Sequence, residues 1–171
     1  MSASGASVAV VMGSSSDWPT VKRTVEVLGE LGLACEVSVI SAHRSPERAR
    51  AFAMGAAGAG VKVIIAAAGG AAHLAGVIAA HTSLPVIGVP MGSGALGGID
   101  ALLATVQMPA GVPVATVAIG SAGTANAAVL AAQILSLGDS DLTTRLANYK
   151  QRLAEKVRQA DEDLQRQIGD S

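Results

Sequence analysis

The chain has 171 residues, half of them apolar and only three aromatic, and its formal net charge is −1. This length fits a single domain, 1–171, built on one core. Nucleic acid is not an expected partner, because its binding needs clustered cations and stacking rings. Charged residues make up 15% of the chain, below the roughly 25% of typical soluble domains, so we expect apolar surface to remain for contacts between subunits.

The sequence shows no sign of export and no stretch suited to a membrane. It lacks the basic region and long apolar run of a signal peptide, and each apolar run is interrupted before about 18 residues. We therefore expect a cytoplasmic protein. The single cysteine, Cys35, excludes a disulfide within the chain and is expected to be a buried, inert thiol in a strand.

The first 137 residues alternate between short apolar runs and helical patterns. In chain order, we predict a strand over 7–12, a helix that ends near Leu31 before Gly32, a strand over 34–40, a helix over 46–59, a strand over 61–68, a helix over 74–80, strands over 84–90 and 112–120, and a helix over 122–137. Strands that alternate with helices indicate an α/β fold with a parallel sheet.

The C-terminal stretch has a different pattern, because its apolar residues recur every three or four positions amid charged ones. They are Leu142, Leu146, Tyr149, Leu153, Val157, Ala160, Leu164 and Ile168. This spacing predicts an amphipathic helix, which would extend a core of about 8–137 by a segment of about 139–168. Its apolar stripe needs a partner, which could be another subunit.

Polar loops follow the predicted strands: GSSSDW, SAHRSP, GGAAH, GSGALGG and GSAGTAN. Open parallel sheets bind ligands at such strand ends, where helix N-termini offer unpaired N–H groups to anions. In the first loop, Ser14 and the backbone of 13–17 suit a phosphate, and Asp17 could accept hydrogen bonds from sugar hydroxyls. Serine and aspartate are also ordinary helix caps, so capping alone explains this loop equally well.

The loop SAHRSP is more informative, because it places an imidazole beside a guanidinium where a strand meets a helix. Arg44 suits an anionic ligand, and His43 can exchange protons near neutral pH. A structural role for the two side chains is an equal alternative. In the loop AGGAAH, Gly69 and Gly70 would let a ligand approach the backbone and His73 adds a polar group, with tight packing as the alternative.

The remaining candidates are weaker. His81 lies late in a predicted helix without polar neighbours and is expected to have a structural or surface role. The glycine-rich residues 92–98 form either a mobile cover or a plain connection, and Gln107, beside two prolines, could face a ligand. No phosphate-loop or dinucleotide fingerprint occurs, and no paired Cys or His pattern for a metal. The sequence therefore predicts chemistry without a cofactor or a metal.

Five motifs together resemble the class I PurE family, the N5-carboxyaminoimidazole ribonucleotide mutases, in the family's order and spacing. They are MGSSSDW, SAHRSP, AGGAAHLAG, VQMPAGVPVATVAIG and AGTANAAVLAAQIL, and they span about residues 8–137. The resemblance implies a three-layer α/β/α, flavodoxin-like domain, a homo-octamer with sites at subunit junctions, and no metal or cofactor. The implied reaction is an isomerisation in de novo IMP biosynthesis, which converts N5-carboxyaminoimidazole ribonucleotide to 4-carboxy-5-aminoimidazole ribonucleotide.

On the matching motifs, the resemblance implies that His43 is the general acid and base. It would first give a proton to the substrate nitrogen as carbon dioxide leaves, and then remove one from the ring carbon after recarboxylation. The ribose phosphate would be held by Ser14, Asp17 and Arg44, and the carboxylate would be enclosed by the GGAAH loop. The implied substrate-binding residues are Ser14, Asp17, Ser41, Arg44, Gly69, Gly70, Ala72 and His73.

The sequence departs from the family's common pattern at Ala75, where proline is usual, at His81, where tryptophan is usual, and in a less polar loop over 92–98. These departures concern loop stiffness, packing and the cover rather than His43. Three other functions stay open: an aminoimidazole ribonucleotide carboxylase that uses free carbon dioxide, a non-catalytic nucleotide- or flavin-binding module on the same fold, and a structural oligomer.

Overall fold

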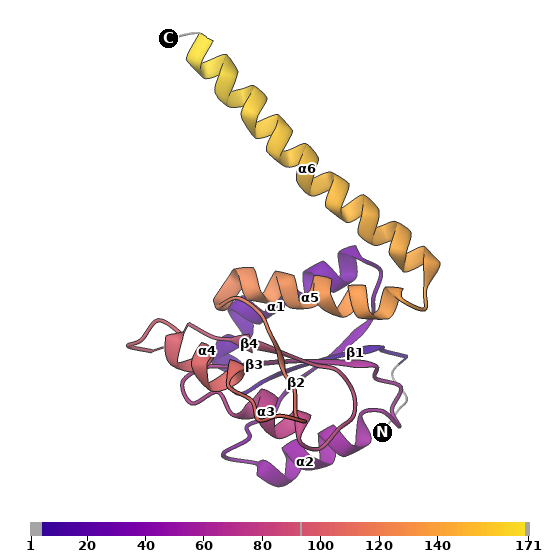
Figure 1. Ribbon diagram of the computed structural model, residues 1–171, viewed down its shortest axis with the longest axis vertical. Coiled ribbons are helices and arrows are strands. Elements are labelled where there is room, and N and C mark those ends of the chain that lie inside the picture. The colour runs from indigo at the N-terminus through magenta and orange to yellow at the C-terminus, as the bar shows by residue number, and fades with distance from the viewer. Residues whose placement is uncertain (1–4, 93, 170–171) are drawn as a thin grey trace.

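The computed structural model describes residues 5–92 and 94–169, which form a five-stranded parallel sheet with helices around it (Figure 1). The strands are β1 (Val8–Met12), β2 (Cys35–Val39), β3 (Val63–Ala68), β4 (Val86–Pro90) and β5 (Ala115–Thr116). Their order across the sheet is β2-β1-β3-β4-β5, which is the order of flavodoxin-like folds. The order reverses at β1, which lies between β2 and β3.

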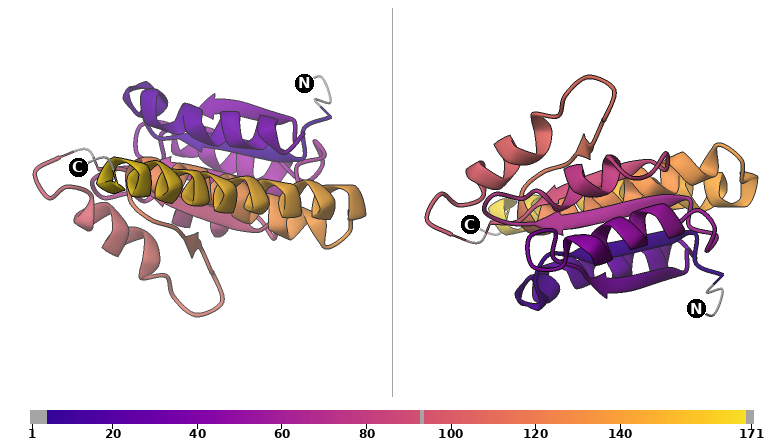
Figure 2. Two further views of the ribbon diagram at one scale, coloured as in Figure 1. Left: turned by 90° about the horizontal axis from the view of Figure 1, so that it is seen from above. Right: turned by 90° about the horizontal axis from the view of Figure 1, so that it is seen from below.

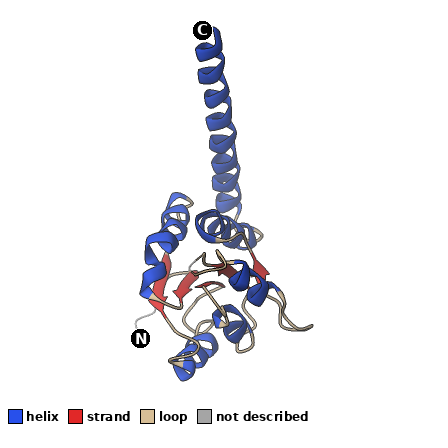
Figure 3. Cartoon of the chain, turned by 90° about the vertical axis from the view of Figure 1, so that its left-hand side faces the viewer, coloured by secondary structure: helices blue, strands red, loops and turns tan. Residues whose placement is uncertain are grey.

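Helices cover both faces of the sheet, and Figure 3 shows the strands in red between helices in blue. One face carries α1 (Trp18–Glu30), which a short 3-10 turn η1 (Ser15–Asp17) precedes, together with α5 (Gly120–Ser136) and the start of α6 (Ser140–Gly169). The other face carries α2 (Pro46–Gly55), α3 (Leu74–Ala79) and α4 (Ile99–Val106). The predicted three-layer α/β/α fold is confirmed.

The core is aliphatic and consists of small side chains. The strands β1, β3 and β4 are buried along their whole length, as expected for strands that helices cover on both sides. Four alanines of α5 are fully buried: Ala127, Ala128, Ala131 and Ala132. Their size lets α1 approach, and the hydroxyl of Thr24 in α1 donates a buried hydrogen bond of 2.9 Å to the carbonyl of Thr124 in α5.

Most element boundaries follow local signals, and four predicted strands match those of the structure to within two residues at each end. The stop predicted after Leu31 is confirmed, because Gly32 adopts a φ of +71° directly after α1. The helix predicted over 46–59 ends earlier, at Gly55, and turns occupy 56–60. Cys35 is only half buried in β2, yet burial raises the pKa of its thiol, which keeps it protonated near neutral pH.

At the β5 edge of the sheet one prediction is wrong and one helix was missed. The strand expected over 112–120 has only two ladder residues, because Pro113 has no N–H to donate and Gly111 turns the chain with a φ of +93°. The helix α4 was not predicted, because it follows a glycine-rich loop and its N-cap, Gly98, offers no side chain. Its outer face leaves Ile99 and Leu103 more than half exposed.

Helix α6 packs on the core at its start and then leaves the body of the molecule, as Figures 1 and 3 show, whereas in the view from above in Figure 2 it overlies the body. Leu142, Leu146 and Tyr149 are buried against the core, and Nε of Arg145 donates a hydrogen bond of 2.8 Å to the carbonyl of Leu31 at the end of α1. Residues 150–169, referred to below as the arm, are all exposed.

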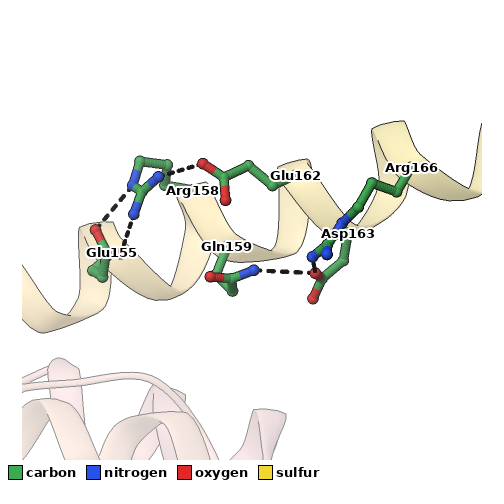
Figure 4. Close-up of polar contacts among 6 residues, drawn as sticks. All are labelled: Glu155, Arg158, Gln159, Glu162, Asp163 and Arg166. Carbon is green, nitrogen blue, oxygen red and sulfur yellow. Dashed lines mark hydrogen bonds and ion pairs between the residues drawn. The ribbon is translucent and has the colours of Figure 1, made fainter.

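The arm is stabilised by ion pairs within itself, which Figure 4 shows. Arg158 pairs with Glu155 and Glu162, and Arg166 pairs with Asp163. The predicted amphipathic helix is thus confirmed, and its distal apolar stripe of Leu153, Val157, Leu164 and Ile168 is exposed in the single chain. None of the described helices is long and apolar enough to cross a membrane.

The close approach of Gly123 in α5 to the segment that leads into this helix gives a testable prediction. A Cβ on this residue would overlap the backbone carbonyl of Ala118, so we expect Gly123→Ala to lower the free energy of unfolding by about 3 kcal/mol, the upper end of over-packing costs. Gly29→Ala in α1 is the control, since its Cβ would meet no atom within 4 Å, and it should stabilise the chain by about 0.5–1 kcal/mol. Urea titration measures both, and equal effects would contradict this account of Gly123.

Candidate active site

A cavity of about 280 Å³ opens at the carboxyl ends of β1, β2 and β3. The strand order reverses there, and open α/β sheets bind ligands at such a point. Three loops, one after each strand, supply the lining. The lining residues are Gly13, Ser14, Ser16, Asp17, Ser41, Ala42, His43, Arg44, Ala68, Gly69, Ala72, His73 and Leu74.

The loop after β1 supplies hydroxyl groups and a buried carboxyl group. The Oγ of Ser14 accepts a hydrogen bond of 3.2 Å from the backbone N–H of Ser16 and lies 2.7 Å from the Oγ of Ser16, so Ser14 both caps η1 and lines the cavity. Asp17 is only 7% exposed. Burial raises the pKa of its carboxyl group, and a hydrogen bond with the Ser14 backbone partly offsets this effect.

The loop after β2 keeps its shape through Ser41. The Oγ of Ser41 accepts a hydrogen bond of 3.2 Å from the backbone N–H of Arg44, and its carbonyl accepts one of 3.0 Å from the Oγ of Ser45. These bonds form a turn that leaves His43 and Arg44 exposed at the cavity. Within 5–92 and 94–169 no carboxylate pairs with Arg44, so its charge is available to an anionic ligand.

The loop after β3 is a tight turn with a strained backbone. The backbone N–H of Ala72 donates to the carbonyl of Gly69 at 3.1 Å, and Gly70 has a φ of +60°. Ala72 has a φ of +43°, a conformation that costs a residue with a Cβ about 1–2 kcal/mol. The turn places His73 directly before α3, as its N-cap residue.

His43 and His73 come from different loops and meet at the cavity. The Nε2 of His43 lies 2.7 Å from the Nδ1 of His73, and the two rings are nearly perpendicular, at 85°, with centroids 4.8 Å apart. At this distance one nitrogen carries the proton and the other accepts it, so the contact cannot hold two N–H groups. Neither ring makes another hydrogen bond within the described part of the chain.

Together these groups suit a small anionic ligand that carries hydroxyl groups. The guanidinium of Arg44 can bind a phosphate or carboxylate, Asp17 can accept from hydroxyls, and the ring nitrogens of the paired imidazoles can donate and accept protons. Where the structure describes the chain, no three His, Cys, Asp or Glu side chains are grouped so as to hold a metal ion.

Eight of the nine predicted site residues line this cavity, and Gly70 is the exception, since it shapes the turn instead. His81 and Gln107 are exposed outside the lining, as are the described residues of the glycine-rich loop 92–98 apart from the buried Gly98. The contact between His43 and His73 was not predicted. The sequence indicates only that both residues follow predicted strands. That β2 and β3 lie close together, on either side of β1, is known only from the strand order.

Comparison with known proteins gives consistent results. The sequence profile described as AIR carboxylase matches residues 7–156. The N5-carboxyaminoimidazole ribonucleotide mutase of Mycobacterium tuberculosis is 52% identical over 162 residues, which cover 95% of this chain and 92% of that protein. Proteins of the same name from Bacillus subtilis and Escherichia coli K12 are also 52% identical, covering 92% and 89% of this chain and 97% and 90% of their own.

A solved structure agrees with this result. The crystal structure of Treponema denticola PurE superposes with a TM-score of 0.82 at 28% identity, covering 92% of this chain and 97% of that one. The profile match extends over most of the chain, and the relatives share half of their residues with it over nearly its full length. This chain therefore belongs to the AIR carboxylase family.

Proposed function

We propose that this chain is an N5-carboxyaminoimidazole ribonucleotide mutase of de novo IMP biosynthesis, an isomerase that acts in the cytoplasm without a cofactor or a metal. The observation that carries the proposal is the cavity in which His43, hydrogen-bonded to His73, lies beside Arg44, whose guanidinium pairs with no carboxylate of the described residues. Relatives that are 52% identical to the chain bear this activity in their names.

Each of the three loops has its own role in substrate binding. Arg44, Ser14 and Asp17 bind the ribose phosphate, since they offer a cation, a hydroxyl and a hydrogen-bond acceptor. Ser41 holds the turn that presents Arg44. The strained turn over 69–73 encloses the carboxylate, which backbone N–H groups can stabilise.

The reaction needs one proton carrier that acts twice. The N–C bond of the carbamate breaks, carbon dioxide leaves, and the nitrogen takes a proton from His43. The ring carbon then forms a bond to carbon dioxide and loses its hydrogen as a proton to His43. The imidazole ends in the state in which it began, so one histidine suffices for both steps.

The isolated chain does not close this site, because His43, Arg44 and His73 are all exposed. Free carbon dioxide would escape from such a cavity, so the proposal includes a homo-octamer with the sites at subunit junctions. Apolar side chains available for such contacts are Trp18, Val37 and Val39 near β2, Leu96, Ile99, Leu103 and Val106 at α4, and the stripe of the arm. Grouped exposure of this kind is typical of interaction surfaces.

The main prediction concerns His43 and is checked by an ultraviolet assay of purified protein. N5-carboxyaminoimidazole ribonucleotide should be converted, whereas aminoimidazole ribonucleotide with bicarbonate should not. His43→Asn should lower kcat by at least about 100-fold, because it removes the proton carrier. His81→Asn, which changes an exposed histidine outside the cavity, should not.

Each other outcome of this assay has a distinct meaning. Turnover of the second substrate alone would assign the carboxylase activity instead. No turnover of either substrate would favour the binding module, and full activity of His43→Asn would reject the proposed role of His43.

A second prediction follows from the buried carboxyl group of Asp17. The pKa of Asp17 is raised above 3.8 in the folded state. Between the pKa of the unfolded state and that of the folded state, the folded protein therefore binds more protons at Asp17 than the unfolded protein does. The free energy of unfolding accordingly falls as the pH rises through this interval and the carboxyl group becomes charged. Asp17→Asn should therefore raise the thermal midpoint at neutral pH, with the gain vanishing in acid. It should also raise KM about tenfold by removing a charged hydrogen-bond acceptor. A lower midpoint at neutral pH would contradict this account.

A third prediction tests the arm as an assembly surface by light scattering. The wild-type chain should assemble into an octamer, and Val157→Glu combined with Leu164→Glu should yield smaller particles, because both residues are exposed on the apolar stripe. Gln151→Glu adds a charge to the exposed opposite face of the arm and should leave the particle intact. An octamer that survives the double substitution would show that the stripe is not part of the interface.

A further inference from the structure

The pair of histidines constrains which atom of His43 can do the chemistry. Its Nε2 is occupied by the 2.7 Å contact with Nδ1 of His73. Its Nδ1 makes no hydrogen bond within the described residues, and the ring lines the cavity. A ligand in the cavity can therefore meet a free ring nitrogen of His43 only at Nδ1 while the pair is intact.

The direction of the hydrogen bond follows from what a general base needs. A neutral imidazole has one N–H and one lone pair. If His73 donated, the lone pair of His43 would be consumed at Nε2 and its Nδ1 would carry the proton, which leaves no base for the ring carbon. If His43 donates from Nε2, its Nδ1 keeps the lone pair. Only the second arrangement allows His43 to act as a base without breaking the pair.

We infer that His73 is the positioning residue of this site: its Nδ1 accepts the Nε2–H of His43, which fixes the tautomer and orientation of that ring so that Nδ1 of His43 exchanges the proton with the substrate. The inference rests on the proposed function, in which His43 is the general acid and base. In the acid form His43 carries a proton on both nitrogens, gives up the one on Nδ1 and keeps the one bonded to His73.

The surroundings of His73 are suited to this role. His73 lies between the strained Ala72, which is 3% exposed, and the pair Leu74 and Ala75, each of which is 2% exposed. The backbone on both sides of the ring is thus fixed by burial, while the ring itself is exposed at the cavity. The other ionisable groups of the lining are Asp17 and Arg44, and neither hydrogen-bonds to the pair.

The proton can be located directly by nuclear magnetic resonance of the protein labelled with 15N-histidine, at a pH at which both rings are neutral. The chain has only three histidines, so substitution of each assigns its signals. The one-bond N–H coupling shows which nitrogen bears the proton, and a coupling across the hydrogen bond identifies the acceptor. We expect the proton on Nε2 of His43. A proton on Nδ1 of His73, or an intact protein without the coupling, would overturn the inference.

Two substitutions at one position separate positioning from simple packing. His73→Asn keeps an acceptor atom near the place of Nδ1, so the Nε2–H signal of His43 should remain and kcat should stay well above that of His73→Leu. His73→Leu removes the acceptor, so the signal should be lost and kcat should fall about 10- to 100-fold, the cost expected of a misplaced catalytic group, with a smaller change in KM. His81→Asn is the matched control and should change neither.

The outcomes distinguish this inference from the function on which it rests. An equal loss of kcat in His73→Asn and His73→Leu, or full kcat in His73→Leu, overturns the positioning role while turnover by the wild type upholds the mutase proposal. A wild-type chain without turnover overturns both. The resonance experiment needs no substrate, so it reports on the hydrogen bond in either case.

Discussion

The site depends on the register of β1 between its two neighbours. Met12, the last residue of β1, pairs with Val39 of β2 and with Ala67 of β3, so the three strands end at nearly the same level. Each strand is parallel, and each continues into a polar loop at the same edge of the sheet. Because a change of register by one residue would turn every side chain to the other face, the buried core on both sides fixes this alignment. This alignment brings the loops that carry His43 and His73 to one edge of the sheet, where their ring nitrogens lie 2.7 Å apart.

The backbone strain at Ala72 is maintained by the packing around it. A positive φ at a residue with a Cβ persists only where the surroundings over-determine the conformation, and here Ala72, Leu74, Ala75 and Ile78 are all buried. Ala75 stands in the first turn of α3. The burial of α3 against the sheet holds the start of this helix in place.

The parts of this structure that the sequence predicts are those with local causes. Apolar runs that end in glycine or polar residues mark β1 to β4, and Gly32 marks the end of α1. The length of β5 and the presence of α4 depend on distant contacts instead: a Cβ on Gly88 of β4 would overlap Thr105 of α4, so this glycine lets the helix lie on the sheet. The candidate site residues could likewise be predicted, because each lies in a loop with a local sequence signal. The hydrogen bond between the two histidines could not, because it joins two loops that are distant in the sequence.

A single chain supplies a rigid set of chemical groups but not an enclosed space for the reaction. The loops that carry His43 and Arg44 are held by hydrogen bonds and buried neighbours, yet both side chains are exposed, and water at the site would compete for carbon dioxide and weaken every electrostatic contact with the substrate. The same chain leaves apolar side chains uncovered on α4, beside β2 and along the arm. Association with other copies of the chain would bury these apolar surfaces. The same contacts would exclude water from the site.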